Sequence, residues 1–296
     1  MTNEHTIPKA QNLLTEGHIP LVYLDWNVMV RMHQGDLPRL FEAVRVRGGT
    51  AAAVPFSLAI LREAAGIEGE GRKKRLSRRL DFIHSITGNL YLGEDDLTPI
   101  FDCASPHSVY EEKGHGFDVD VGGELSSMLP YGVLDRSRKQ LGLSPRELNN
   151  ASPDEAATVI DELLRTDAVQ KWMPTDASLG LKGMLDFGRK LYQAHKGGLA
   201  GRFGLAASDL SGMDRGALEF SFFYGLLDSC GFWNDKRQEY AKGSRIEDVA
   251  HARLSASCGR LVSEDKRFRK KAQACFSYFA ERVNVFSAQE AVDAFV

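Results

Sequence analysis

Short apolar runs that alternate with helical patterns dominate both ends of the chain. The run at 21–24, bounded by Pro20 and Asp25, is typical of a buried strand. The other strands predicted in the N-terminal part are 51–54 and 90–92, and its predicted helices are 37–47, 57–65 and a basic helix that ends near residue 86. A strand, a helix and a strand at this spacing predict parallel strands joined by a right-handed crossover.

The C-terminal part returns to the same alternation. Ser244 and Glu247 have the S-x-x-E spacing of a capping box, in which both side chains satisfy free amides at the start of a helix. We predict that this helix runs to about Cys258, because Gly259 then interrupts it. The remaining predicted elements are a strand at 260–263, a helix at 264–281 and a closing strand at 283–286.

The middle of the chain has a different pattern. Gly, Ser and Asp cluster around 104–126, and apolar residues then recur at helical spacing without strand alternation. The clearest predicted helices are 154–164, 181–194 and 217–227. We therefore predict an α/β fold with a parallel central sheet, divided into residues 1–101, a large helical insertion at 102–242, and residues 243–296. The aromatic residues 220–224, with Trp172 and Trp233, are predicted to form the core of the insertion.

Composition excludes several classes of protein. The 296 residues are 43% hydrophobic and 26% charged, as in ordinary globular proteins, which excludes a disordered or collagen-like chain. No apolar run approaches the roughly 20 residues of a membrane-spanning helix, and the polar residues 1–9 do not resemble a signal peptide. The 4 cysteines include no C-x-x-C pair, which argues against a zinc ribbon and a disulfide framework. We expect a cytoplasmic protein without membrane contact.

Basic residues are concentrated in two short runs, although the net charge of −3 gives no overall footprint of nucleic-acid binding. Six of the eight residues at 72–79 are basic, as are five of the six at 266–271. Such runs are usually solvated helix faces. Their functional interpretation is contact with the phosphate backbone, which positions nucleic acid without reading its sequence. The candidate contact residues are Arg72, Lys73, Arg78, Lys266 and Arg267.

Acidic residues follow several predicted strands, at the edge where ligands of open α/β sheets bind. They are Asp25 after the first strand, Glu63 within the next helix, Asp248 one turn into the capped helix, and Asp265 after the fourth strand. Two carboxylates about 4 Å apart repel by about 4 kcal/mol at an effective dielectric near 20, so such a cluster takes up protons or binds a cation. Oxygen ligands favour Mg²⁺ or Mn²⁺, which activate water and stabilise charge on a phosphoryl group. The acids therefore predict metal-dependent hydrolysis of phosphodiesters.

Three segments carry these acids: Tyr23-Leu24-Asp25-Trp26-Asn27, the helix from Ser57 to Glu63, and residues 248–268, in which two acids, a small-residue helix and a strand fall in order. Together they resemble the family of PIN-domain nucleases. The resemblance covers roughly residues 20–101 and 243–290 and leaves out the helical middle. It implies a three-layer α/β/α, RNase-H-like fold and Mg²⁺ or Mn²⁺ as cofactor. The implied activity is endonucleolytic cleavage, of RNA more often than of DNA, which leaves a 5′-phosphate and a 3′-hydroxyl.

The same resemblance assigns roles to individual residues. Asp25, Glu63, Asp248 and Asp265 would bind the metal, and Asn27 would support the first acid or the phosphate. His251 lies one helical turn after Asp248 and therefore shares its face, where it would bind phosphate, orient an acid or move a proton. Each acid also has an ordinary structural explanation. Asp25 could be a turn residue and Glu63 a solvated helix position. Asp248 could complement the helix dipole, and Asp265 could cap a helix. Competing acids nearby are Glu68, Glu70, Asp228, Asp235 and Glu264.

Two alternative functions stay open on the sequence. A phosphatase of the haloacid-dehalogenase type also begins with an Asp after its first strand, but that family needs a second Asp where this chain has Asn27. An inactive PIN-like scaffold that binds RNA or a protein has no use for acids that repel one another. A P-loop enzyme is excluded because no G-x-x-x-x-G-K-[ST] motif occurs.

Nucleic acid, with RNA ahead of DNA, is the main partner that we expect. The size of the insertion also leaves room for an inhibitor protein of the antitoxin kind. Toxin–antitoxin systems, defence and RNA processing are the settings compatible with such a nuclease. A homodimer is an assembly that the sequence allows.

Overall fold

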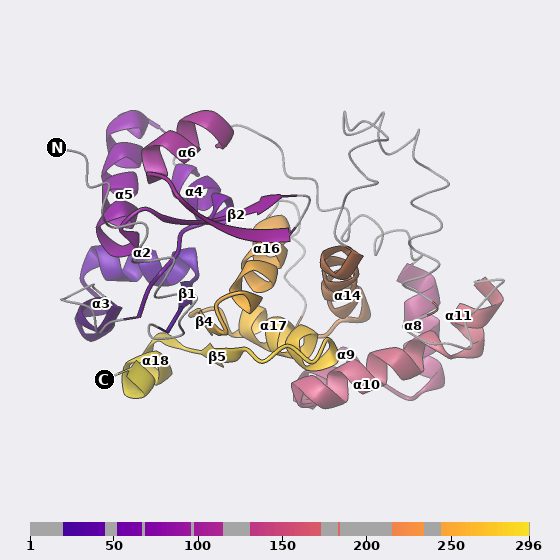
Figure 1. The fold of residues 1–296 in the computed structure, drawn as a ribbon. Coiled ribbons are helices and arrows are strands. Elements are labelled where there is room, and N and C mark those ends of the chain that lie inside the picture. The colour runs from indigo at the N-terminus through magenta and orange to yellow at the C-terminus, as the bar shows by residue number, and fades with distance from the viewer. Residues whose placement is uncertain are drawn as a thin grey trace.

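The structure is a computed structural model of the chain, and it describes residues 20–44, 52–66, 69–95, 98–114, 131–172, 183, 215–233 and 244–295. The fold is mixed α/β and mostly helical, with a small parallel sheet of three strands and an antiparallel pair of strands (Figure 1). Of the helix predicted at 181–194, only residue 183 lies within the described residues. Within the described ranges, no helix is long and apolar enough to cross a membrane.

The parallel sheet joins the two ends of the chain. It consists of β1 (Tyr23–Leu24), β4 (Arg260–Val262) and β5 (Asn284–Phe286), hydrogen-bonded in the order β1-β4-β5. In the register of β1 and β4, Leu24 lies opposite Val262. Both strands are almost entirely buried and apolar, as expected for parallel strands that are covered on both faces. The residues that follow β1 and β4 therefore emerge side by side at the same edge of the sheet.

The second sheet is an antiparallel hairpin formed by β2 (Leu90–Asp95) and β3 (Thr98–Cys103). Residues 52–56 lie between the two sheets and contact each of them through one isolated parallel bridge, Leu21 with Ala53 and Phe56 with Tyr91. The predicted parallel neighbour of the first strand is therefore present, but only as a bridge.

These pairings correct the predicted single sheet of five strands. Of the strand predicted at 51–54, the described residues 52–54 do not form a regular strand, because alanine packs weakly on a pleated surface and Pro55 has no amide for a ladder. The strand predicted at 90–92 is longer and belongs to the hairpin, whose second strand crosses the predicted start of the insertion at residue 102. The sequence pattern does not predict β3, because β3 leads directly into the region rich in Gly, Ser and Asp.

Within the described ranges, five helices lie before residue 115, and the last of them falls inside the stretch predicted as the insertion. They are α2 (Trp26–Gln34), α3 (Pro38–Val44), α4 (Leu58–Ala65), α5 (Arg72–Thr87) and α6 (Pro106–Lys113). α2 begins directly after Asp25 and ends at Gly35, whose φ of 85° is the left-handed conformation that glycine adopts readily. The helix predicted at 37–47 corresponds to α3, whereas α2 was not predicted. α4 begins where Ser57 caps it by accepting a hydrogen bond from the Ile60 amide.

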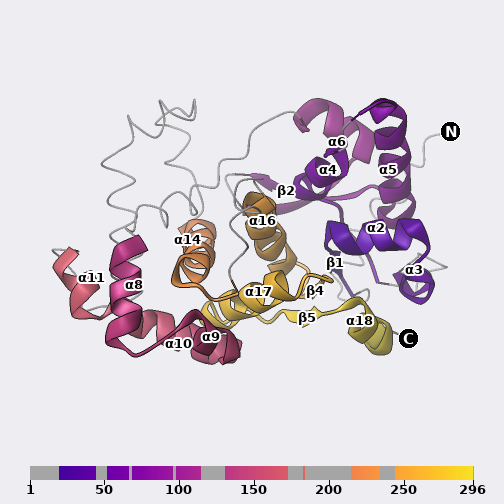
Figure 2. The ribbon, with the colours of Figure 1, turned by 180° about the vertical axis from the view of Figure 1, so that it is seen from behind.

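Four described helices of the middle region gather at one end of the molecule (Figures 1 and 2). They are α8 (Tyr131–Gln140), α9 (Pro145–Asn150), α10 (Pro153–Leu164) and α11 (Asp167–Trp172), and they are followed along the chain by α14 (Arg215–Cys230). α14 lies between this end and the two helices of the C-terminal part that flank β4. Those are α16 (Ser244–Ala256) and α17 (Lys266–Tyr278), and a further helix, α18 (Ala288–Phe295), follows β5 and was not predicted.

A continuous apolar cluster connects the middle region with the C-terminal part. Phe220 of α14 lies 5.9 Å from Phe276 and 5.6 Å from Phe279, measured between ring centroids. Phe223 lies 4.6 Å from Tyr278. Phe220, Phe222, Phe223 and Tyr224, predicted as core of the insertion, are thus buried, and this aromatic cluster packs against α17 and its C-terminal end, whereas Trp233 is half-buried.

A buried ion pair also joins α14 to α17. Lys271 Nζ lies 2.9 Å from Asp228 Oδ1, and neither side chain has exposed surface. The same ammonium group lies 5.1 Å from the centre of the Tyr224 ring. The last residue of the basic run at 266–271 is therefore an interior ion-pair partner and not a phosphate contact, and Asp228 is occupied by it.

Candidate metal centre

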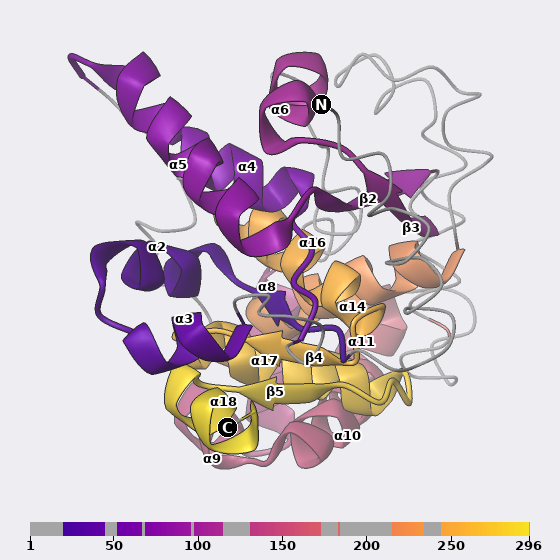
Figure 3. The ribbon, with the colours of Figure 1, turned by 60° about the vertical axis from the view of Figure 1, so that its left-hand side comes forward.

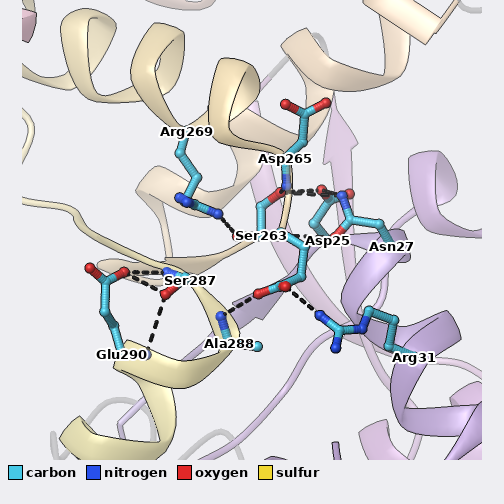
Figure 4. Close-up of polar contacts among 10 residues, drawn as sticks. Asp25, Asn27, Arg31, Ser263, Asp265, Arg269, Ser287, Ala288 and Glu290 are labelled. Carbon is cyan, nitrogen blue, oxygen red and sulfur yellow. Dashed lines mark hydrogen bonds and ion pairs between the residues drawn. The ribbon is translucent and has the colours of Figure 1, made fainter. Parts of the chain in front are cut away.

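Asp25 lies at the carboxyl end of β1 and is the N-cap residue of α2. An Asp at this position ordinarily caps the helix by accepting a hydrogen bond from its second or third amide, yet the Asp25 side chain makes no such capping bond. Its Oδ2 instead accepts hydrogen bonds from Ser263 Oγ at 2.6 Å and from Asn27 Nδ2 at 2.5 Å (Figure 4). Ser263 is in place because it follows Val262, which lies opposite Leu24. The carboxylate is thus turned away from its local role and held by groups from both strand ends.

Glu63 and His251 meet Asp25 at this edge. The Nε2 atom of His251 lies 2.9 Å from Glu63 Oε2 and 3.7 Å from Asp25 Oδ1. Glu63 comes from α4 and His251 from α16, and these two helices are in contact. His251 is fully buried, Asp25 is 5% exposed, and the Glu63 side chain is 27% exposed. The group therefore has one side open to solvent, at Glu63.

These three side chains, which we call the acid–histidine group, are suited to binding a cation. Among the described His, Cys, Asp and Glu residues, this is the group whose potential ligand atoms all lie within 4.8 Å of one another. Two ligands bound in adjacent positions at about 2.1 Å from one ion lie roughly 3 Å apart, so small shifts would suffice to bind an ion. Two carboxylates and one imidazole also match the donors that divalent ions take in proteins.

The far side of the imidazole is fixed by a chain of hydrogen bonds. Nδ1 of His251 lies 2.8 Å from the Tyr23 hydroxyl, which lies 2.6 Å from Ser57 Oγ. All three residues are fully buried. Tyr23 and Ser57 were not predicted as site residues. The available signals were that Tyr23 shares the strand face of Asp25, two residues on, and that Ser57 is a helix cap preceding Glu63.

Burial and mutual charge set the protonation of the group. Burial, together with the charge of Glu63, raises the pKa of Asp25 to about 6 against the opposing effect of His251. Burial alone would lower the pKa of His251, but Glu63, Asp25 and Asp248 outweigh it and raise that pKa to about 9. At neutral pH the imidazolium is therefore the counter-ion of the two acids. Burial also raises the pKa of Tyr23 well above its ordinary value, which keeps its hydroxyl protonated.

We expect the metal-free protein to lose stability as the pH rises from about 6.5 to about 9. The pKa of His251 is higher in the folded state, about 9 against an ordinary 6.5. Its proton therefore stabilises the fold below pH 6.5, and this contribution, on the order of 3 kcal/mol, is lost as the pH passes the folded pKa. The raised pKa of Asp25 likewise makes the folded state less stable as the pH rises from 3.8 to about 6.

Urea denaturation in the presence of chelator, at several pH values across this range, measures the change in the free energy of unfolding. His251→Gln is the control, because it removes the titrating group and is expected to flatten the profile. An equally steep profile in that variant would show that other groups cause the pH dependence.

Asp248 and Asp265 occupy different places relative to the group. Asp248 lies one turn before His251 on α16, is half-buried, and contributes to the raised pKa of that histidine. Asp265 caps α17: its Oδ1 accepts hydrogen bonds from the amides of Arg267 at 2.7 Å and Phe268 at 3.1 Å. Its carboxylate points away from Asp25 (Figure 4). The structure thus brings together Asp25 and Glu63 with His251, and it leaves Asp265 in the role of a helix cap.

Asn27 and Glu264 stabilise the strand ends around Asp25. Besides donating to Asp25, Asn27 accepts a hydrogen bond from the Glu264 amide at 3.1 Å. The Glu264 carboxylate forms an ion pair with Arg31 and accepts a hydrogen bond from the Ala288 amide at 2.8 Å. Asn27 therefore supports the first acid, which is one of the roles that the resemblance implies. Glu264 connects α2, the end of β4 and the start of α18 and is not part of the acid–histidine group.

The predicted nucleic-acid contacts differ in exposure. Arg72, Lys73 and Arg78 are exposed on α5, a helix that projects from the body of the molecule in Figure 3. Lys266 is exposed as well, with its ammonium group 4.9 Å from the centre of the Trp233 ring, and Arg267 is half-buried.

Comparisons of this chain with models of protein families, with curated proteins and with solved structures find no match. The resemblance to PIN-domain nucleases therefore rests on the residues of this chain alone.

Proposed function

We propose that this protein is a metal-dependent nuclease that hydrolyses phosphodiester bonds, in RNA in preference to DNA. The observation that carries the proposal is the meeting of buried Asp25 with Glu63 and His251 at the carboxyl edge of the parallel sheet. A three-layer PIN-like arrangement belongs to the same proposal. It is supported by the parallel order β1-β4-β5 and by the parallel bridges of residues 52–56.

A purely structural role explains Asp25 poorly. Its charged form is disfavoured by burial, and its side chain makes no cap bond to α2. Asn would accept the same hydrogen bonds from Ser263 and Asn27 without a buried charge. A carboxylate retained in this position is therefore better explained by a task that needs negative charge, such as binding a cation.

Different residues of the chain would bind the metal and orient its ligands at such a centre. Asp25 and Glu63 would hold the metal with His251, and Asp248 would add negative charge nearby. Ser263 and Asn27 fix the orientation of the Asp25 carboxylate. A divalent cation held there supplies activation of water and neutralisation of charge on the phosphoryl group. The open side at Glu63 is where a phosphodiester would approach.

Cleavage of labelled single-stranded RNA and DNA, with Mn²⁺, with Mg²⁺ and with chelator, tests this function. We expect metal-dependent cutting by the unchanged protein, lost in Glu63→Gln and kept in the matched control Glu70→Gln, which alters an exposed acid. Asp265→Asn is expected to reduce cutting much less than Glu63→Gln, because Asn caps a helix as well as Asp does. Absence of cutting under every condition would contradict the proposal and favour the scaffold hypothesis.

The exposed basic face of α5 is suited to contact the phosphate backbone. α5 lies against α4, the helix that carries Glu63, and Arg79 of α5 donates a hydrogen bond to the Ala64 carbonyl at 2.8 Å. Arg79 also lies 5.4 Å from the centre of the Trp26 ring, so it serves packing. The Arg79 end of α5 therefore packs near Glu63, and this packing supports the proposal that the exposed basic side chains of the same helix contact the substrate.

Replacing Arg72, Lys73 and Arg78 together by Gln is expected to weaken RNA binding and to flatten its dependence on salt. Each lost phosphate contact lowers the slope of log K against log salt by about one. Fluorescence anisotropy with labelled RNA at several salt concentrations measures both quantities. Arg146→Gln, an exposed charge removed from α9 at the distant end, is the control and should leave them unchanged. An unchanged slope in the triple variant would exclude α5 from the interface.

A further inference from the structure

The acid–histidine group has a nitrogen donor among its three side chains, and this distinguishes it from a site built of carboxylates alone. Nε2 of His251 faces both Glu63 Oε2 at 2.9 Å and Asp25 Oδ1 at 3.7 Å. Mg²⁺ prefers oxygen ligands, whereas imidazole suits transition-metal dications. The ligand atoms of the group therefore favour some divalent ions over others.

The orientation of the imidazole is built into the interior. Its Nδ1 faces the Tyr23 hydroxyl, and that hydroxyl faces Ser57 Oγ, with all three side chains fully buried. When Nδ1 carries the proton and donates it to the Tyr23 oxygen, that hydroxyl can donate to Ser57, and the Nε2 lone pair faces the two carboxylates. Fixing a metal-binding histidine through a hydrogen bond from its other ring nitrogen is the usual arrangement in metal sites.

We infer that His251 is a direct nitrogen ligand of the metal, that Tyr23 is the positioning residue that fixes its tautomer, and that the centre selects a transition-metal dication such as Mn²⁺ over Mg²⁺. This inference rests on the proposed metal centre and adds the identity of its ion. Aromatic packing supports the same orientation, because the Phe268 ring lies edge-on to the imidazole with centroids 6.4 Å apart.

Calorimetric titration of the protein with Mn²⁺ and with Mg²⁺ tests the selectivity, and pulsed EPR of bound Mn²⁺ tests the ligand. We expect Mn²⁺ to bind at least about tenfold more tightly than Mg²⁺ and to show a hyperfine coupling to an imidazole nitrogen. In His251→Gln that coupling should disappear and the two affinities should converge, since Gln offers an oxygen in place of the nitrogen. A control variant, His84→Gln, alters an exposed histidine of α5 and should change nothing.

Tyr23→Phe tests the positioning role. It is expected to lower Mn²⁺ affinity by about 10- to 100-fold, as loss of an outer-shell partner does, while Mg²⁺ affinity changes less. Circular dichroism and thermal unfolding establish whether the variant folds. If it does not, Ser57→Ala interrupts the same chain one residue further away and should lower Mn²⁺ affinity more weakly.

The outcomes separate this inference from the proposed nuclease activity. Mn²⁺ binding with nitrogen coupling but without cleavage of any nucleic acid would uphold the inference and overturn the proposed function. Cleavage supported equally by Mg²⁺, with no nitrogen coupling in bound Mn²⁺, would overturn the inference and leave the function standing. Failure to bind either ion would overturn both, and His251 would then be only the counter-ion of two buried acids.

Discussion

At about pH 8 and without added metal, Asp25→Asn should unfold at a higher urea concentration than the unchanged protein while losing metal-dependent cleavage. The gain follows from burial, which raises the pKa of Asp25 to about 6 and so disfavours its charge at this pH. Relieving that charge is worth on the order of 1–3 kcal/mol. Ser263 and Asn27 can still donate to the new amide oxygen. Cleavage should fall by about 1,000-fold or more, because a metal contributes several kcal/mol of transition-state stabilisation.

Urea denaturation followed by circular dichroism gives the stability change, and cleavage under single-turnover conditions gives the change in rate. Asp265→Asn is the matched control, since it makes the same substitution at an N-cap aspartate whose side chain does cap its helix. Its stability should change by less than about 0.5 kcal/mol. A destabilised Asp25→Asn that still cleaves would mean that Asp25 serves the fold rather than a metal centre.

Lys271→Met is expected to destabilise the protein by about 3–5 kcal/mol, because it leaves the buried Asp228 carboxylate without its cation. Replacing both partners, as Lys271→Met with Asp228→Leu, should restore most of the loss, since no buried charge then remains. Urea denaturation measures both variants. Lys270→Met is the control: it removes a neighbouring charge of α17 that is only half-buried, and its effect should be small. Equal effects at 270 and 271 would show that the ion pair is not the cause.

The elements that sequence predicted well have strong local signals. α4, α10 and β4 lie within one residue of their predicted positions, because a capping serine, a serine–proline start and a glycine break mark them. The sequence pattern does not predict α2, because Asp25 and Asn27 after a short apolar run are as typical of a turn at a strand end as of a helix start. The antiparallel pairing of β2 with β3 was not predicted, because the polar residues of β3 obscure the alternation of apolar and polar residues that is typical of a strand.

Within the candidate site, the sequence predicts Asp25, Glu63 and His251, but it does not predict their hydrogen-bond partners Tyr23, Ser57 and Ser263. Tyr23 and His251 lie 228 positions apart in the sequence, so their hydrogen bond has no local signal. Asp265 was included because its spacing resembles a family motif. Spacing alone does not distinguish an acid that faces the sheet edge from one that caps the next helix.

The hydrogen bond between Glu63 and His251 has a consequence for synthesis of the protein. The two residues are 188 positions apart, and a ribosome needs roughly 10–40 s to add that many residues. Throughout that interval the nascent chain has two acids of the proposed centre and neither the imidazole nor the strand that completes the edge. Under the proposed function, the nuclease would therefore be inactive toward the messenger RNA from which it is translated until α16 and β4 have been synthesised.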